Sequence, residues 1–489
     1  MPRALVWIRD DLRLDDHLAL LAALEARPEV ALLTVLDPRA WGRAEGLGPV
    51  DLPRLGRARA HFWMTSVARL RDAARARGGE LLVRVGDPGE VVPRMSAELD
   101  AAEVFAQAHV ADEETRSERA VARALAASGR RLILTPGRTL IHAEELPFPL
   151  AELPDVFTAF RKRVEAEAVM RTPRPAPERL PAPPDAEPGA LPDPESLVGA
   201  DRLDGAPPDP GPALMRFEGG EEAGWAELLA WTFDADALGT YKQTRNGLLR
   251  REDSSRLSPW LAAGCLSPRR VAEVVARYEQ ERGANESTYW LIFELLWRDY
   301  FAFLARREGP RLFRQSGVGR RARRWRHDRE RFDAWREGRT GYPFVDAFMR
   351  ELRSTGFMSN RGRQNVASFL AKSLGIDWRW GAAWFEACLV DYDPASNWGN
   401  WQYAAGVGTD PRDRVFNVVK QAFDYDPDAE FTKRWVPAVG ALPEGTAHTP
   451  WTSADVDYPD PLVDPALMTR PPRTGRSRGA RGGRKGTRG

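Results

Sequence analysis

A proline-dense segment divides the chain into two parts with different patterns. Residues 171–194 read RTPRPAPERLPAPPDAEPGALPDP, and the segment rich in proline, aspartate and glycine extends to about residue 220. Such a composition opposes regular helices and strands, so we expect a long connector without elements of its own. Because 489 residues are too many for one ordinary core, a domain is expected on each side.

The part before the connector alternates short apolar runs with stretches rich in alanine, leucine and arginine. Helical composition occurs at 57–77 and 113–128. The apolar runs lie at 4–9, 30–37, 80–86, 103–109 and 131–137. This alternation is typical of a doubly wound parallel sheet, which predicts an α/β domain over 1–140 and a linker over 141–220. No G-x-G-x-x-G motif follows the first run, so a classical dinucleotide site there is unsupported.

The part after the connector has a different pattern. Long amphipathic segments punctuated by Gly and Pro predict an all-helical domain over 221–465. Fourteen of the 17 tryptophans lie between residues 225 and 451, which indicates either a Trp-rich core or an aromatic-lined cleft. The tail 466–489 is basic: residues 470–489 hold eight Arg or Lys and no acid, and we expect disorder there.

Charge and cysteine usage narrow the class of protein. The net charge is only +1, but residues 311–326 contain seven arginines and no acid, which together with the tail raises nucleic acid as a partner. No apolar run of about 18 residues occurs and the N-terminus is charged, so we expect a cytoplasmic protein without a membrane partner. Cys265 and Cys388 are expected to be reduced, and the scattered histidines indicate no metal site.

The stretch SSRLSPWLAAGCLSP contains two Ser-Pro pairs. Each pair suits a helix with serine at the N-cap and proline at the first helical position. Ser254, Ser255 and Arg256 precede the first pair, at Ser258. Hydroxyls, a guanidinium and free amides at a helix start make an anion site that suits a diphosphate.

Two other segments place polar and aromatic residues on one helix face. ELLWRDY puts Glu294, Trp297 and Arg298 at i, i+3 and i+4, and NRGRQN does the same with Asn360, Arg363 and Gln364. A solvated face would gain nothing from tryptophan, so we interpret both as walls of a polar-aromatic cleft.

The stretch DYDPASNWGNWQY has the composition of neither a core nor a turn. Two carboxylates precede three amides, two indoles and a phenol, whereas a core uses aliphatic side chains. What this stretch does therefore depends on what the rest of the chain supplies.

Several long motifs resemble the photolyase/cryptochrome family, in the form found in its DASH branch. They are TYKQTRNGLLRREDSSRLSPWLAAGCLSP, WLIFELLWRDYF, GRTGYPFVDAFMREL, TGFMSNRGRQNVASFLAKSLGIDWRWGA and DYDPASNWGNWQYAAGVG. The resemblance runs from VWIRDDLRLDDH to about residue 465. It implies an N-terminal α/β domain, a long linker and a helical domain that binds FAD in a U-shape.

The resemblance assigns cofactor residues position by position. Arg298 should lie against the cofactor, Asp393 should accept from the polar edge of the flavin ring, and Asn397 should face flavin N5. Arg363 and Asp391 match the ion pair beside the ring. The phosphates and ribityl end should be held by Tyr241, Ser254, Ser255, Arg256, Leu257 and Ser258. Trp401, Trp378 and Trp325 match the electron-transfer chain, whereas Trp398 and Trp380 do not match it and are expected to serve packing.

In the family's repair enzymes, light-excited reduced FAD donates an electron to a cyclobutane pyrimidine dimer, which splits and returns it. Glu294 matches the acid that hydrogen-bonds the dimer and stabilises its radical anion. Other positions that match DNA or lesion contacts are Arg245, Trp297, Asn360, Arg361, Gln364 and Tyr403. The resemblance thus implies a deoxyribodipyrimidine photo-lyase type of enzyme.

Two replacements imply a preference for single-stranded DNA. Gln364 stands where double-strand repair enzymes carry Met, and Tyr403 stands where they carry Trp. Both replacements make the cavity more polar and reduce its stacking area. Stacking helps to hold a flipped lesion, so this cavity holds one less well. The segment SNRGRQN lacks the histidines of a (6-4) photolyase. The alternative is a blue-light photoreceptor or DNA-binding transcriptional regulator without significant repair, and Glu294 favours repair. In either case we expect a monomer.

The family's α/β domain commonly binds methenyltetrahydrofolate as an antenna, through a glutamate before a Val near the end of the fourth strand. Here His109 precedes Val110. A histidine does not reproduce a carboxylate that accepts from the pterin's amino edge, so we expect folate binding to be weak or absent. Glu113 and Glu114 are the candidates to substitute from the next turn.

Overall fold

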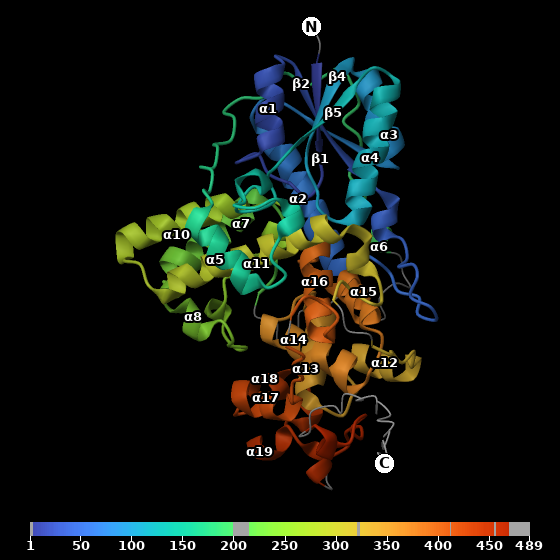
Figure 1. Ribbon diagram of the computed structural model, residues 1–489, viewed down its shortest axis with the longest axis vertical. Helices are drawn as coiled ribbons and strands as arrows, with labels where there is room; N and C mark the ends of the chain where they lie inside the picture. The colour runs from blue at the N-terminus through green and yellow to red at the C-terminus, as the bar shows by residue number, and fades with distance from the viewer. Residues whose placement is uncertain (1–2, 199–214, 320–322, 411, 454–455, 469–489) are drawn as a thin grey trace, which may run out of the picture.

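The computed structural model describes residues 3–198, 215–319, 323–410, 412–453 and 456–468. In Figure 1 a sheet flanked by helices forms the upper part, and helices alone form the rest. This confirms the predicted fold class, an α/β domain with a parallel sheet followed by an all-α domain.

The five strands form one parallel sheet in the order β3-β2-β1-β4-β5. Their bounds differ from the predicted apolar runs by at most two residues at either end. They are β1 (Arg3–Ile8), β2 (Val30–Leu36), β3 (Leu81–Val85), β4 (Ala101–Gln107) and β5 (Arg131–Thr135). The order reverses between β1 and β4, and in open α/β sheets ligands bind beyond the carboxyl ends of the strands at such a point.

Both faces of the sheet are covered. Ala4, Val6 and Ile8 of β1 belong to one buried cluster, and Leu5 and Trp7 belong to another on the opposite face. This alternation follows from the two-residue period of a strand. The covering helices are α1 (Leu18–Ala26), α2 (Arg57–Ala76), α3 (Pro88–Glu98) and α4 (Asp112–Ala127).

The connector contains more structure than its composition predicts. After α5 (Phe157–Glu167), the short helix α6 (Pro194–Val198) packs against α2, so the prediction that 171–220 lacks elements is wrong at this point. The reason is local: proline is tolerated in the first turn of a helix, and Leu197 and Val198 are buried.

Helices make up the regular structure of the described residues after the connector, apart from isolated bridges. Short 3₁₀ and π segments connect several of them. The α-helices are α7 (Glu221–Leu229), α8 (Tyr241–Thr244), α9 (Ser258–Ala262), α10 (Pro268–Arg282), α11 (Glu286–Glu308), α12 (Arg329–Arg336), α13 (Pro343–Thr355), α14 (Asn360–Ser368), α15 (Trp378–Cys388), α16 (Pro394–Ala405), α17 (Val418–Tyr425), α18 (Glu430–Trp435) and α19 (Glu444–Ala447).

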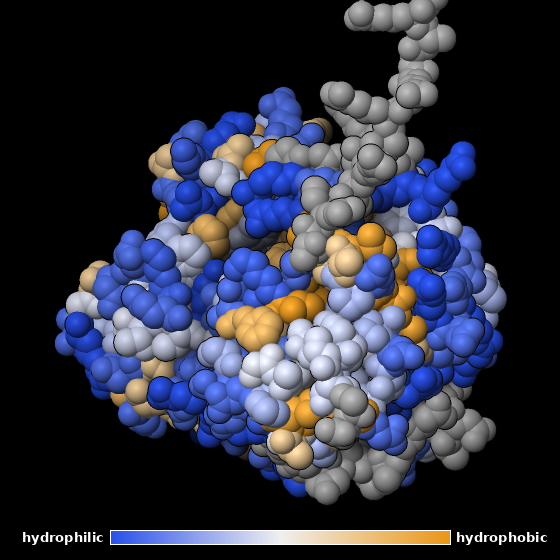
Figure 2. All heavy atoms as spheres, turned by 90° about the horizontal axis from the view of Figure 1, so that it is seen from below, coloured by the Kyte–Doolittle hydropathy of each residue, from blue (hydrophilic) through white to orange (hydrophobic). Residues whose placement is uncertain are grey.

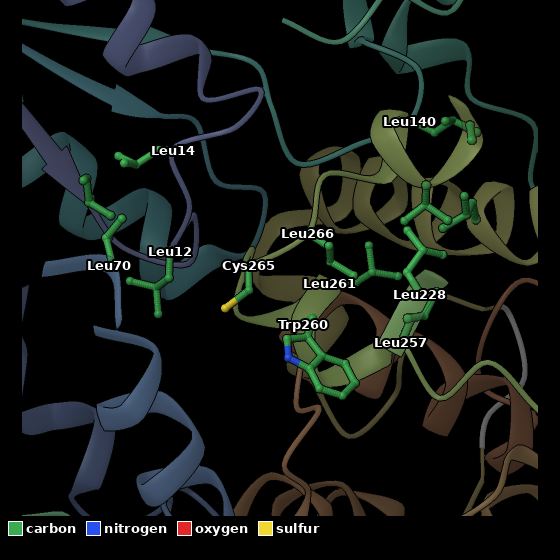
Figure 3. Close-up of a cluster of buried hydrophobic side chains, with 14 of the residues drawn as sticks. Leu12, Leu14, Leu70, Leu140, Leu228, Leu257, Trp260, Leu261, Cys265 and Leu266 are labelled. Atoms are coloured by element: carbon green, nitrogen blue, oxygen red, sulfur yellow. The ribbon is translucent and has the colours of Figure 1, made fainter. Parts of the chain in front are cut away.

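One hydrophobic core runs from the sheet into the helical domain. Figure 3 shows Leu12 and Leu14, from the loop after β1, in the same cluster as Trp260 of α9 and Leu266. The Trp260 ring meets Phe62 of α2 edge-on, at 5.8 Å between centroids. The two domains are therefore joined by shared apolar packing.

A buried polar contact joins the same two domains. Arg269 of α10 pairs with Asp16 at 2.7 Å, and Ser267 donates its hydroxyl to the same carboxylate. Ser267 stands at the N-cap of α10 without capping it, and α9 begins at Ser258, after Leu257. The predicted N-cap serine followed by proline is thus confirmed in position for Ser267, although its hydroxyl makes no capping hydrogen bond, whereas Ser258 is the first residue of its helix.

Cys265 and Cys388 are buried free thiols. Among the described residues, no helix is long and apolar enough to cross a membrane, and no His, Cys, Asp and Glu side chains form a metal-binding group. Seen from below in Figure 2, hydrophilic residues surround a smaller gathering of hydrophobic ones.

Candidate functional site

Asn397 lies buried in the first half of α16. Its Nδ2 donates to the carbonyl of Ala382 on α15 at 3.0 Å, which fixes the amide plane. Its Oδ1 makes no hydrogen bond within the described part of the chain and is free to contact a bound molecule.

Arg363 of α14 and Asp391 form the predicted ion pair, at 2.8 Å between Nη2 and Oδ2. Arg363 Nε also donates to the carbonyl of Met358 at 2.9 Å, so the guanidinium is held from two sides. Asp391 Oδ1 is buried without a hydrogen-bond partner. A buried carboxylate oxygen without a hydrogen-bond partner can accept a hydrogen bond from a ligand.

Asp393 is the N-cap of α16, and its Oδ1 accepts from the backbone N–H of Ser396 at 2.7 Å. Its other oxygen pairs with Arg138, and both side chains are buried. Burial opposes ionisation, but Arg138 and Arg298 outweigh it and lower the pKa of Asp393 to about 2. The ionised carboxylate is therefore built into the site, and its contact with the ring edge stays a prediction.

Arg298 is fixed by two backbone carbonyls. It donates to the carbonyl of Leu261 at 2.9 Å and to that of Arg138. Burial, with Arg138 nearby, lowers the pKa of Arg298 to about 10. The sequence analysis missed Arg138, which follows β5 and is distant in sequence from both partners.

The predicted phosphate segment forms a partly buried loop in front of α9. Tyr241 lies within hydrogen-bond reach of Ser254; burial raises the pKa of its phenol while this bond lowers it. Ser255 and Leu257 are buried, whereas Ser258 is exposed. The structure thus brings Tyr241 and Ser254 together as predicted.

Arg256 has a left-handed backbone, with φ 49°. Non-glycine residues rarely adopt this conformation, and it costs on the order of 1 kcal/mol or more, so it is held by its surroundings. The guanidinium carbon lies 5.6 Å from the centre of the Phe357 ring, and Nε is buried without a partner. This leaves a donor available to an anion.

Glu351 of α13 is an acid that sequence reasoning missed. Burial raises the pKa of its carboxyl to about 8, against the opposite effect of Arg256 and Arg363. Its Oε2 is buried without a partner. No spacing signal links Glu351 to these arginines, because they lie on separate elements.

Glu294 of α11 is the acid on the other wall of the site. Its Oε1 accepts from Arg245 Nη1 at 2.8 Å, and the side chain is 29% exposed. Burial raises the pKa of Glu294, with Arg245 acting in the opposite direction. The structure therefore brings together two residues that were predicted to contact DNA.

Trp297, one turn after Glu294 in α11, meets Tyr403 of α16. Their ring centroids are 5.8 Å apart, and the planes are nearly perpendicular at 85°. Phe157 of α5 stacks on Trp297 at 3.6 Å and 12°. Sequence reasoning missed Phe157, which lies in the linker and carries no motif.

The start of α14 presents the remaining predicted lesion contacts. Asn360 is exposed. Arg361 donates to Gln364 Oε1 and to Asn246 Oδ1, both at 3.0 Å, and its guanidinium lies 4.2 Å from the centre of the Tyr425 ring. The Gln364 amide is therefore tied to Arg361.

The three predicted redox tryptophans extend from the interior to the surface. Trp401 is 2% exposed and Trp378 is 0% exposed, whereas Trp325 is only partly buried. A Cβ on Gly381 of α15 would lie 2.2 Å from the ring of Trp401, so only glycine allows this approach. Trp378 lies one turn earlier than Gly381 in α15.

Three further tryptophans lie in the same domain as Trp401, Trp378 and Trp325. Trp398 packs edge-on against Trp378 at 5.6 Å, and Trp380 is fully buried, in agreement with packing roles. Sequence reasoning missed Trp335, whose ring centre is 6.1 Å from that of Trp401.

Comparison with known proteins identifies the family. Residues 4–183 match the DNA photolyase family, and residues 290–470 match the FAD binding domain of DNA photolyase. The Cryptochrome DASH of Natronomonas pharaonis is 49% identical over 95% of this chain and 98% of its own length.

Solved structures of the family superpose over nearly the whole chain. The Synechocystis cryptochrome has a TM-score of 0.90 at 43% identity, covering 96% of this chain and 98% of its own. A bacterial class III photolyase from Agrobacterium tumefaciens has a TM-score of 0.80 at 30% identity, covering 96% and 95%. The chain belongs to the photolyase/cryptochrome family, in its DASH branch. It therefore carries this family's FAD-binding domain.

The site of this DASH cryptochrome has the donors and acceptors that FAD requires. Asp391 Oδ1, Arg256 Nε and Glu351 Oε2 are buried without partners. Buried polar groups in folded proteins are normally paired, so these atoms indicate a missing polar ligand. Both charge signs are present, which suits a molecule with phosphates and amide-like ring edges.

Apart from this site, a cavity of about 210 Å³ lies at the carboxyl ends of β1 and β4. His109 lines it, and burial, followed by Arg9 and Arg138, lowers the pKa of this imidazole well below its usual value. Glu113 forms an ion pair with Arg54, at 2.8 Å between Oε1 and Nη1. Burial raises the pKa of Glu114 to about 7, and its Oε2 has no partner.

Proposed function

We propose that this DASH cryptochrome binds FAD in the helical domain and uses blue light to split cyclobutane pyrimidine dimers in single-stranded DNA. The observation that carries the proposal is Glu294, an acid held beside the aromatic pair Trp297 and Tyr403 on the wall of the FAD-binding domain. A protein that only senses light has no need of such an acid.

The cofactor would be held non-covalently by residues already described. Arg256 would pair with the phosphates, and the Arg363–Asp391 pair and Asn397 would contact the ring system. The remaining contacts would come from Tyr241, Ser254, Ser255, Leu257, Ser258, Arg298 and Asp393. Reduced FAD, when bound, supplies the light-excited electron. Asn397 is neutral, so it orients a ring nitrogen without adding charge.

The chain's own residues would bind and orient the lesion. Glu294 would hydrogen-bond the dimer and stabilise the negative charge that develops on it, while Trp297 and Tyr403 contact its bases. Arg245, Asn360 and Arg361 would hold the adjacent DNA, because guanidinium and amide groups suit phosphate and base edges.

The preference for single strands rests on limited stacking area. One neighbour of Trp297 is already Phe157 at 3.6 Å, and Tyr403 stands perpendicular to Trp297, so the pair does not form two parallel platforms. Flipping a lesion out of duplex DNA costs a few kcal/mol, whereas in single strands most of that cost is absent. A cavity with little stacking area therefore favours single-stranded DNA, where flipping the lesion costs least.

The test is dimer loss per absorbed photon on matched single- and double-stranded oligonucleotides. We expect repair of the single strand, little repair of the duplex, and a loss of repair in Glu294→Ala that leaves the FAD content unchanged. Glu281→Ala, an exposed acid on α10, is the matched control and should behave as wild type. Equal yields on the two substrates would contradict the strand preference, and no repair on either would favour a photoreceptor.

We further propose that folate binding is weak or absent. The cavity of about 210 Å³ is small beside the roughly 300–1,000 Å³ of typical ligand pockets, and the neutral His109 offers no carboxylate. Purified protein should therefore contain much less folate than FAD after acid extraction, and His109→Glu should raise the folate content. Stoichiometric folate in the wild type would refute this. If Glu114 holds folate instead, binding should be lost as the pH falls through about 7, where that carboxyl takes up its proton.

A further inference from the structure

Trp290 shares a helix face with Glu294, one turn earlier in α11. Its indole Nε1 donates to Glu294 Oε1 at 3.1 Å. The indole also stacks on Phe293, at 4.6 Å between centroids and 30° between planes. The donor that reaches Glu294 is thus attached to a ring that is itself held in place.

Two cations lie over the Trp290 ring, one from α8 and one from the residue that follows it. The guanidinium carbon of Arg245 and the Nζ of Lys242 each lie 5.0 Å from the centre of the Trp290 ring. Cations over an indole are attracted by its negative face. Arg245 is therefore fixed twice, by the ring and by its 2.8 Å bond to Glu294 Oε1.

These contacts leave the two oxygens of Glu294 in different states. Oε1 accepts from both Trp290 and Arg245, whereas Oε2 makes no hydrogen bond to any described residue. Both donors stabilise the ionised form, and burial favours the neutral form. Removing either donor therefore changes both the orientation and the protonation of the acid.

The other charged or titratable groups around this region come from several elements. They are Tyr241, Lys242 and Arg245 from α8 and its end, Arg161 and Glu165 from α5, Arg361 from α14 and Tyr403 from α16. Among these groups only Arg245 pairs with Glu294. Of the two donors to Glu294, Arg245 and Trp290, the indole is the neutral one, so its contribution can be separated from that of a charge.

We propose that Trp290 is a positioning residue for Glu294: its N–H and the cations on its ring hold the carboxylate with one oxygen engaged and the other available to the lesion. This inference rests on the proposed repair function. It adds that the acid works only in the orientation and protonation state that Trp290 sets.

The test compares Trp290→Phe, which keeps a ring but removes the N–H, with Trp290→Ala, which removes both. Trp225→Phe on α7, another partly buried tryptophan, is the control for a general effect of losing an indole. The first readout is the infrared carbonyl band of Glu294, assigned by its loss in Glu294→Gln and titrated in the FAD-loaded protein without DNA. We expect the midpoint to rise by about one pH unit in Trp290→Phe and to stay unchanged in Trp225→Phe.

The second readout is the dissociation constant for a single-stranded oligonucleotide with one dimer, measured in the dark. We expect a loss of about threefold in Trp290→Phe and of about tenfold or more in Trp290→Ala, where the cations lose their support as well. An unchanged Glu294 midpoint in both variants would overturn the inference. A shifted midpoint in a protein that repairs neither substrate would support the positioning role and reject only the repair function.

Discussion

Replacing Trp401 by phenylalanine is expected to slow the blue-light reduction of bound, oxidised FAD by at least about 100-fold, because each 1.4 kcal/mol added to a barrier costs about a factor of ten. Phenylalanine keeps most of the bulk, but it is far harder to oxidise than an indole. Trp401 is 2% exposed and lies against Gly381, so the substitution removes a redox partner from an otherwise packed interior. The measurement is the rise of reduced-flavin absorbance under constant blue light with an external reductant.

The matched control is Trp398→Phe, three residues earlier in α16, which should photoreduce at nearly the wild-type rate. Trp378→Phe and Trp325→Phe should also be slow, since they interrupt the same path. If the FAD is reduced chemically beforehand, dimer splitting by Trp401→Phe should match the wild type, because Glu294 and the lesion contacts are untouched. Wild-type photoreduction in all three variants would contradict the chain.

The double variant Gln364→Met and Tyr403→Trp should bind and repair duplex lesions about tenfold better than the wild type. A base that stacks on an aromatic side chain gains about 1–3 kcal/mol, and an added 1.4 kcal/mol is tenfold in affinity. The indole enlarges the surface beside Trp297, and methionine removes an amide that is tied to Arg361. Single-strand repair should change little, because the flipping cost is mostly absent there.

The measurement is dimer loss per photon on matched duplex and single-stranded oligonucleotides, together with dark binding constants. Asn400→Asp, an exposed position on the same helix as Tyr403, controls for a general change of α16. If duplex repair does not improve while FAD content and single-strand repair are retained, cavity polarity is not what limits duplex repair.

The strands and the helical domain were predictable because their signals are local. The five apolar runs and the loss of that pattern after the connector depend only on neighbouring residues. Helix α6 was missed because proline density outweighed the two apolar residues that anchor it. Ser267 was correctly predicted at the N-cap of α10, but the hydrogen bond of its hydroxyl was not, because its partner, Asp16, comes from the other domain.

Residues of the site could be predicted only where they lie within a recognisable motif. Trp290 has the same kind of spacing signal as Trp297, but on the N-terminal side of Glu294, and it was overlooked. Arg138, Glu351 and Phe157 carry no signal, because their partners Asp393, Arg256 and Trp297 are distant in sequence. Contacts between elements depend on the complete tertiary structure, which local pattern does not contain.

The shared core has a practical consequence for anyone who wants the light-responsive part as a module. Leu12 and Leu14 of the α/β domain lie in one cluster with Trp260 and Leu266 of the helical domain. Excising the helical domain would leave that apolar surface facing water, and exposed surfaces of this kind promote aggregation. A fusion protein should therefore carry the whole chain, with its partner attached at an end.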